Sequence, residues 1–147
     1  MTQTSGVAQV VVLAFSALIL IPSAALQARE QGGKKPSLSL KATPAISFAP
    51  SRVVMVVEVK GGSDDFEDFY CPTLEWEWDD LTRSTQESDC APYEAGKSTI
   101  RRRYTIERQF KNAGSYRVFV RFKKSTRVVA AANTQVQVRA GLGDPGF

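Results

Sequence analysis

Clustered carboxylates are the residues of this chain whose type and spacing come closest to a chemical site. Between Glu58 and Glu94 the sequence has twelve acids and two bases, whereas the stretch from Lys97 to Arg139 has twelve bases and one acid. Hard cations such as Ca²⁺ bind clustered carboxylate oxygens. The candidate calcium ligands are Asp64, Asp65, Asp79 and Asp80. No EF-hand spacing is present, and such charge clusters are usually solvated loops, so a calcium site is an alternative rather than the main interpretation.

Two further carboxylates could act as an acid–base pair. Glu75 and Glu77 share one face of a predicted strand, and a glycosidase needs two carboxyl groups at this kind of separation. A flat sheet face offers no cleft and no means of raising the pKa of one carboxyl. The chain contains no histidine, so a Ser–His or Cys–His nucleophile pair and a histidine metal site are excluded. We therefore expect no enzyme activity, no catalytic residue and no cofactor.

An N-terminal apolar segment predicts export. The run over residues 10–21 is short for a bilayer span, and Pro22 followed by small residues is typical of a signal-peptidase site. Cleavage after Ala25 places small residues at both required positions, whereas cleavage after Ala28 places a leucine at one of them. We predict a signal peptide over residues 1–28 and a secreted or periplasmic protein. No Lys or Arg precedes the apolar run, so an uncleaved membrane anchor is the alternative.

The predicted export determines how the two cysteines are interpreted. Cys71 and Cys90 are separated by 18 residues. An even number of cysteines in an oxidising compartment indicates a disulfide. A bridge across a loop of this size should stabilise the fold by about 3 kcal/mol in the chain-entropy model. If the cysteines are paired, thiolate metal binding and redox chemistry are excluded as well.

The basic second half of the chain could contact an anionic partner. The candidate contacts are Arg101, Arg103, Lys124 and Arg127. The net charge is only +4, so any attraction would be local. For an exported chain, an anionic wall polymer or lipid head group is a more reasonable partner than nucleic acid, which we do not expect.

The elements that must position these residues are strands, because apolar residues alternate with polar ones along most of the chain. The clearest case is the segment 52–60, where Val53, Met55 and Val57 share one face. The first predicted strand covers residues 38–42 and is continued by residues 45–48. The others cover residues 52–60, 74–79, 82–85, 99–110, 116–123 and 127–139. A flexible polar linker should precede this domain over residues 29–37, and a glycine-rich disordered tail should follow it over residues 140–147.

A polar turn between the predicted strands 99–110 and 116–123 contains a recognisable pattern. Phe110 is followed after three residues by Gly114, Tyr116 and Val118 in the form Gly-x-Tyr-x-Val. Gly114 could adopt a positive φ in the turn. Tyr116 falls where a tyrosine corner would place its hydroxyl against nearby backbone.

This pattern resembles the PKD (polycystic kidney disease) domain family. Trp76 and Trp78, followed by two aspartates, are similar to the family's second motif, although the expected glycines are absent and Arg108 stands where the family often has histidine. The resemblance covers residues 38–139. It implies an immunoglobulin-like, antiparallel two-sheet sandwich of about seven strands with a buried tryptophan. It also implies contacts with a protein or a carbohydrate. Because neither cysteine sits on strand B or F, the chain is not a true immunoglobulin domain.

The same topology predicts where the opposite charges meet. Strand C (residues 74–79) lies beside strand F (residues 116–123) in such a sheet, with acids pointing outward on C and bases outward on F. The expected ladder consists of Glu75, Glu77 and Asp79 opposite Arg117, Arg121 and Lys123. We expect these charges to pair with each other and to leave the bases of strand E (residues 99–110) for a partner.

The sequence therefore predicts an exported, non-catalytic β-sandwich that binds an unidentified protein or polysaccharide. Contact with a membrane is expected only through an uncleaved N-terminal segment. The alternatives are a calcium-dependent, lectin-like module and a small hydrolase that uses carboxylates.

Overall fold

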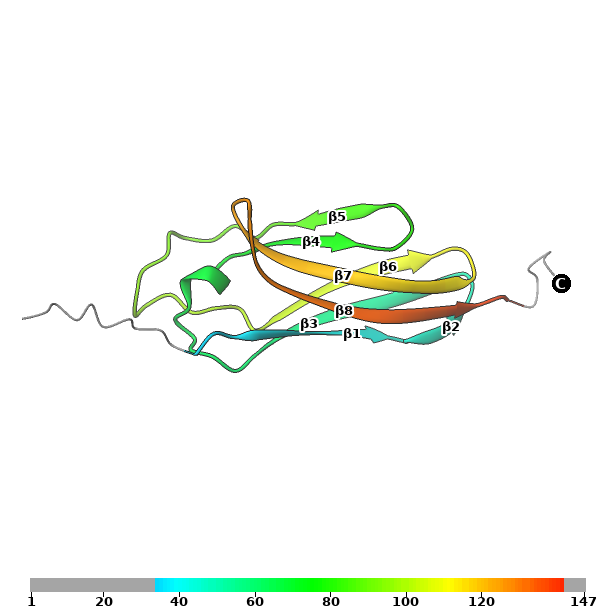
Figure 1. Ribbon diagram of the computed structural model, residues 1–147, viewed down its shortest axis with the longest axis horizontal. Helices are drawn as coiled ribbons and strands as arrows, with labels where there is room; N and C mark the ends of the chain where they lie inside the picture. The colour runs from blue at the N-terminus through cyan, green and yellow to red at the C-terminus, as the bar shows by residue number, and fades with distance from the viewer. Residues whose placement is uncertain (1–33, 142–147) are drawn as a thin grey trace, which may run out of the picture. The chain divides into compact units, whose positions relative to one another are not determined.

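In the computed structural model, which describes residues 34–141, the chain folds into an all-β sandwich (Figure 1). The strands are β1 (Ser37–Thr43), β2 (Ile46–Phe48), β3 (Ser51–Lys60), β4 (Thr73–Glu77), β5 (Arg83–Gln86), β6 (Arg103–Phe110), β7 (Gly114–Lys124) and β8 (Arg127–Arg139). One sheet has the order β1-β3-β6 and the other the order β2-β8-β7-β4-β5. Strand β4 pairs with β7, as expected for the predicted strands over residues 74–79 and 116–123, and β7 pairs with β8.

The core between the sheets follows from the alternation in the sequence. On β3, Val53, Met55 and Val57 are fully buried, and the residues between them point outward. The rings of Trp76 and Trp78 are also fully buried and stack with their centroids 5.4 Å apart. The Trp78 Nε1–H donates a hydrogen bond to Ser84 Oγ at 2.8 Å, which satisfies the buried donor. The core position predicted for the tryptophans is confirmed.

The predicted disulfide between Cys71 and Cys90 is present, and Cys71 lies two residues before β4. It ties the long segment between β5 and β6 to the entry of β4. A short 3-10 helix, η1 (Glu67–Phe69), precedes it and buries Phe69 completely. This stretch lies outside the predicted strands, and Phe69 was not predicted as a core residue.

The tyrosine corner also forms. The Tyr116 hydroxyl donates to the Asn112 carbonyl at 2.9 Å, and the Tyr116 ring lies 4.6 Å from that of Phe110, centroid to centroid. The expectation for Gly114 was wrong, because Gly114 opens β7 and is not among the glycines with positive φ. A Cβ there would lie 3.2 Å from the Tyr116 ring, so the absence of a side chain lets the ring pack over this residue.

The sandwich differs from the expected one in strand number and in one pairing. It has eight strands instead of about seven, and β2 pairs with β8 in the parallel direction, so the sheets are not wholly antiparallel. The cause is Pro44, which has no N–H to continue the β1 ladder. After Pro44 the chain crosses to the other sheet, where Gln137 N–H donates to the Ala45 carbonyl at 2.8 Å.

Two boundaries also differ from the sequence-based ones. Strand β6 begins at Arg103 instead of residue 99, because the Ile100 N–H donates to the carbonyl of Asp64 in a loop. At the N-terminal side, Pro36 is buried and β1 begins at Ser37, so the end of the expected linker packs on the domain. The predicted signal peptide, most of the linker and residues 142–147 of the predicted tail lie outside the described residues. No helix within residues 34–141 is long and apolar enough to cross a membrane.

Candidate binding face of the five-stranded sheet

The outer face of the five-stranded sheet divides into two halves along its strands. Paired residues on neighbouring strands point to the same side of a sheet, so the register shows which side chains share this face. We call one group the paired half, made of Glu75, Glu77, Arg83, Arg121 and Lys123. We call the other the unpaired half, made of Ile46, Phe48, Ser115, Arg117, Phe119, Gln135, Gln137 and Arg139. The paired half lies toward the disulfide, and the unpaired half toward the tyrosine corner.

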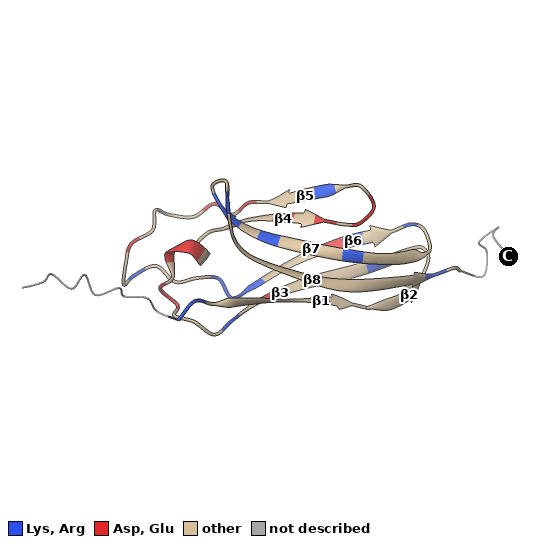
Figure 2. Ribbon diagram, viewed as in Figure 1, with Lys and Arg blue, Asp and Glu red and all other residues tan. Residues whose placement is uncertain are grey.

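The paired half is a ladder of ion pairs. Arg121 Nη1 lies 2.9 Å from Glu77 Oε2 and 3.6 Å from Glu75 Oε1, and Lys123 Nζ lies 3.2 Å from Glu75 Oε2. Arg83 on β5 adds a longer contact of 3.8 Å to Glu77. Figure 2 shows the basic bands along β7. The expected ladder is confirmed for these residues.

Two members of the expected ladder behave differently. Asp79 uses Oδ2 to accept the backbone N–H of Arg117 at 2.9 Å, since the chain turns away from the sheet there with a φ of 61° at Asp79. Within residues 34–141, the Arg117 guanidinium makes no ion pair. Arg117 is therefore exposed on the unpaired half.

We expected the bases of β6 and of the segment before it to be left for a partner, but three of the four have acidic partners. Arg102 pairs with Asp64, Arg103 with Glu58 at 3.5 Å, and Arg108 with Asp80. Arg108 also lies over the Trp78 ring, 5.2 Å from its centroid. These three arginines form ion pairs with acidic residues of neighbouring strands and loops. The reason is that the acid-rich segment wraps both ends of β6.

The four bases predicted to contact an anionic partner fall into two places. Arg101 and Arg103 are linked by a bond from Arg101 Nε to the Arg103 carbonyl, 2.9 Å. Lys124 and Arg127 face each other across the β7–β8 turn, where Lys124 donates to the Tyr70 carbonyl at 3.0 Å and Arg127 pairs with Asp68. The structure brings each pair together but leaves the two pairs on different sheets. Anion binding at either pair stays a prediction.

The candidate calcium ligands are separated. Asp64 and Asp65 precede η1, whereas Asp79 and Asp80 lie in the β4–β5 turn (Figure 2). Asp65 accepts from the Tyr93 hydroxyl and from the Gly96 N–H at 2.7 Å, which lowers its pKa. Partial burial acts to raise the pKa of Asp80, but bonds from Thr82 and Arg108 lower it on balance. Within residues 34–141 no group of three or more potential ligands could hold a metal ion.

The carboxylates considered for catalysis have the opposite electrostatics from those of a general acid. The hydrogen bond from Lys123 lowers the pKa of Glu75 and outweighs partial burial, and the charges of Lys123, Arg121 and Arg83 lower it further. A glycosidase requires one carboxyl with a raised pKa. Glu75 and Glu77 therefore act as partners for bases on this face.

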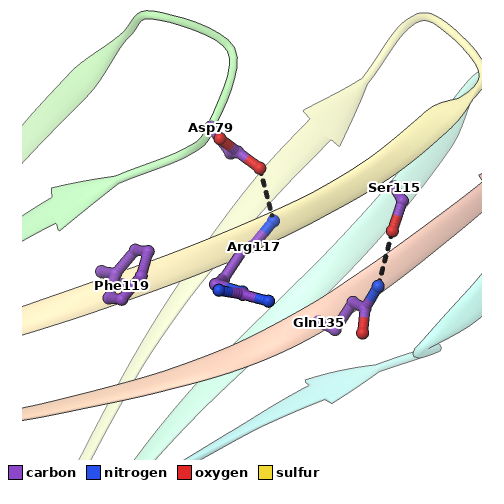
Figure 3. A pocket seen from close by; sticks show the side chains of 5 residues that line it. All are labelled: Asp79, Ser115, Arg117, Phe119 and Gln135. Atoms are coloured by element: carbon purple, nitrogen blue, oxygen red, sulfur yellow. Dashed lines mark hydrogen bonds between the residues drawn. The ribbon is translucent and has the colours of Figure 1, made fainter.

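A small recess opens in the unpaired half. It has a volume of about 300 Å³ and is lined by Asp79, Ser115, Arg117, Phe119 and Gln135 (Figure 3). In this view the Arg117 guanidinium lies between the Phe119 ring and Gln135. The Gln135 amide donates to Ser115 Oγ at 2.6 Å, which fixes two of the polar groups. We call this site the Arg117 recess.

The predicted strand phases place Arg117 and Asp79 on this face, but the recess was not predicted. It did not single out Phe119, Ser115 or Gln135. One signal was available, because Phe119 alternates with buried residues and so points to the solvent side of β7.

Comparison with known proteins gives similarities of fold. No family model matches the chain, and no curated protein matches it. Among solved structures, a PKD domain of an M14-like peptidase from a Thermoplasmatales archaeon matches with a TM-score of 0.47 and 15% identity, covering 73% of this chain and 98% of that one. The CARDB domain of a Pyrococcus furiosus protein, solved with di-metal ions, matches with a TM-score of 0.47 and 13% identity, covering 73% and 94%. Superoxide reductase (neelaredoxin) from Ignicoccus hospitalis matches with a TM-score of 0.41 and 12% identity, covering 70% and 80%.

Proposed function

We propose that this protein is an exported, non-catalytic β-sandwich module that binds a protein or polysaccharide partner through the unpaired half. One observation carries the proposal. Elsewhere on the described sheet faces, bases such as Arg52, Lys60 and Arg121 have acidic partners within 4 Å. The unpaired half instead combines an arginine without an ion pair, a half-buried Phe119 ring and two exposed apolar residues on β2.

The composition of the unpaired half supports a role in binding. Ile46 and Phe48 are 56% and 62% exposed, and are among the most exposed large apolar side chains of residues 34–141. Binding surfaces are enriched in aromatic residues and arginine and depleted in lysine and glutamate. The unpaired half has two phenylalanines, two arginines and no lysine or glutamate.

The absence of catalysis in this proposal is supported by the state of the carboxylates. Glu75, Asp65 and Asp80 all have lowered pKa values because bases or N–H and O–H donors hold them in the charged form. Acid–base catalysis near neutral pH needs a group tuned toward that pH. None of these three carboxyls has a pKa raised toward neutral pH.

Export is supported by the disulfide between Cys71 and Cys90, since structural disulfides persist in oxidising compartments. In this proposal the apolar N-terminal segment is the export signal. The test is N-terminal sequencing of the protein recovered from the periplasm or the medium of its source cell. A start after Ala25 or Ala28 supports a cleaved signal peptide, whereas an intact N-terminus in the membrane fraction supports the anchor.

The binding face is tested by capture from the native cell envelope. The bait is the purified domain, and the variant is Ile46→Ser/Phe48→Ser, which removes two exposed apolar side chains without touching the core. The matched control is Val128→Ser, since Val128 is 49% exposed on the same sheet but beside Lys123 in the paired half. We expect one envelope component to be retained by the wild type and by Val128→Ser and lost by the double variant. Equal capture by all three proteins would contradict the proposal.

A further inference from the structure

The Arg117 recess has a distinctive set of unused hydrogen-bonding groups. Among bonds within residues 34–141, Asp79 uses only Oδ2, so Oδ1 remains an acceptor. Gln135 uses its Nε2, so its carbonyl oxygen remains a second acceptor. Ser115 Oγ accepts from Gln135 and keeps its own O–H to donate, and the Arg117 guanidinium has five N–H donors. The recess therefore presents donors and acceptors side by side.

The charges of the recess balance as well. Arg117 contributes one positive charge and Asp79 one negative charge, and the other three lining residues are neutral. A phosphate, sulfate or carboxylate offers only acceptors at neutral pH and would meet the Asp79 carboxylate. A hydroxyl group both donates and accepts, so neighbouring hydroxyls on one ligand can bond to Arg117 and Asp79 together.

An apolar wall completes the site. Phe119 lines the recess and is half-buried. Arg121 of the paired half lies 5.9 Å from the centre of its ring, so Phe119 marks the border between the two halves. A volume of about 300 Å³ lies at the lower limit of small-ligand pockets. The recess thus suits one ring-sized unit with hydroxyl groups at its rim and C–H groups on its face.

The register shows where a longer ligand would continue. Ser115 on β7 pairs with Gln137 on β8, and Gln137 pairs with Ile46 on β2, which forms a row across three strands. Two strand spacings amount to about 10 Å. A second or third unit would therefore pass over Gln137 and rest on the exposed side chains of Ile46 and Phe48.

From these observations we propose that the Arg117 recess binds one neutral sugar residue of a polysaccharide, with the following residues of the polymer lying toward β2. This inference rests on the proposed binding function and names its partner. A protein partner fits less well, because protein interfaces have a contiguous apolar core. Here the apolar groups are dispersed among amides, a hydroxyl and a guanidinium.

The experiment is a titration of the ¹⁵N-labelled domain, followed by the shifts of its backbone amides. The neutral probes are cellopentaose, chitopentaose, maltopentaose and mannopentaose, and the anionic probe is a pentamer of galacturonate. We expect at least one neutral probe to shift amides of the Arg117 recess and of β2, while the anionic probe shifts neither. Gln135→Ala should weaken binding about tenfold, the effect of losing one good hydrogen bond. Gln109→Ala, an exposed glutamine on β6 of the other sheet, is the matched control and should leave the affinity unchanged.

A second variant separates neutral from anionic ligands. Asp79→Asn keeps an oxygen that can accept the Arg117 N–H but removes the negative charge, and asparagine tolerates a positive φ. For a neutral sugar the affinity should stay equal or fall by several-fold, because a charged acceptor makes the stronger bond. Tighter binding of the galacturonate pentamer than of every neutral probe, or no shift with any neutral probe at millimolar concentration, would overturn the inference.

The two proposals fail in different ways. If Ile46→Ser/Phe48→Ser abolishes capture of an envelope protein and no neutral oligosaccharide binds, the binding face stands and the sugar assignment is wrong. If the double variant changes neither capture nor the oligosaccharide shifts, the binding face itself is wrong.

Discussion

The paired and unpaired halves share one sheet and one core but use their polar residues differently. In the paired half, Arg121 lies within reach of both Glu75 and Glu77 on the next strand. In the unpaired half, Arg117 sits four residues from Arg121 on the same strand face and has no acid partner within residues 34–141. A shift of one residue in the β4–β7 register would bury the ladder charges and expose Trp76. The paired half therefore specifies the register, whereas in the unpaired half donors and acceptors remain without partners within residues 34–141.

The largest expected effect comes from the disulfide, which supports the end of the sandwich next to the paired half. Replacing both cysteines, Cys71→Ser/Cys90→Ser, should lower the free energy of unfolding by about 2–4 kcal/mol. Urea unfolding followed by the fluorescence of the two buried tryptophans measures this loss. Ligand binding at the unpaired half should survive in the folded fraction. A variant as stable as the wild type would show that the bridge does not support this end.

The tyrosine corner is the corresponding support at the other end. Tyr116→Phe keeps the ring contact with Phe110 and removes only the hydroxyl that bonds to the Asn112 carbonyl. The expected loss is about 1 kcal/mol, the usual net value of one hydrogen bond. The same urea titration measures it, by comparison with the wild type. A larger loss than that of the disulfide variant would reverse the ranking of the two ends.

A double-mutant cycle tests the ladder itself. Glu77 and Arg121 should show a coupling of about 0.3–1 kcal/mol at low salt, since their contact of 2.9 Å is partly exposed. Glu77 and Arg117 should show none, because no contact joins their side chains in the structure. The coupling should fall as salt is added. Equal coupling in both cycles would remove the distinction between the halves.

The smallest expected effect is in the dependence of stability on pH. The pKa of Glu75 in the folded protein is lowered from the ordinary value of 4.5, first by the hydrogen bond from Lys123. A lowered carboxyl pKa contributes stability that is complete above about pH 4.5 and is lost as the pH falls through the folded-state value. Lys123→Met should therefore make the acid-side loss of stability shallower, whereas Arg117→Met should not change it. Unfolding free energies measured between pH 6 and pH 3 compare the two variants.

Much of the fold could be predicted from the sequence, since alternation of apolar residues locates strands without knowledge of their partners. Val53, Met55 and Val57 identified the buried face of β3 in this way. The crossing of β2 could not be predicted, because its three residues carry no signal for which sheet they join. Phe69 was missed for a related reason, as a single aromatic residue in a short 3-10 helix has no periodicity.

The site was harder to predict than the fold. The ion-pair ladder could be predicted from the strand phases alone, because it required only that β4 lie beside β7. The Arg117 recess depends on Gln135 from β8, on the bond between Gln135 and Ser115, and on the turn at Asp79. Each of these is a contact between distant parts of the chain. No spacing within the sequence encodes them.

The parallel pairing of β2 with β8 has a mechanical consequence. Strand β1 begins at one end of the sandwich and β8 finishes at the other (Figure 1). Tension between these two ends acts along the strands, so the bonds that join β2 to β8, including Ala49 N–H to the Arg139 carbonyl at 2.8 Å, are loaded together in shear. A handle at Ser125 in the β7–β8 turn would instead peel the strands one bond at a time and should unfold the domain at a lower force in a single-molecule experiment. The sandwich would thus resist a pull along its own length.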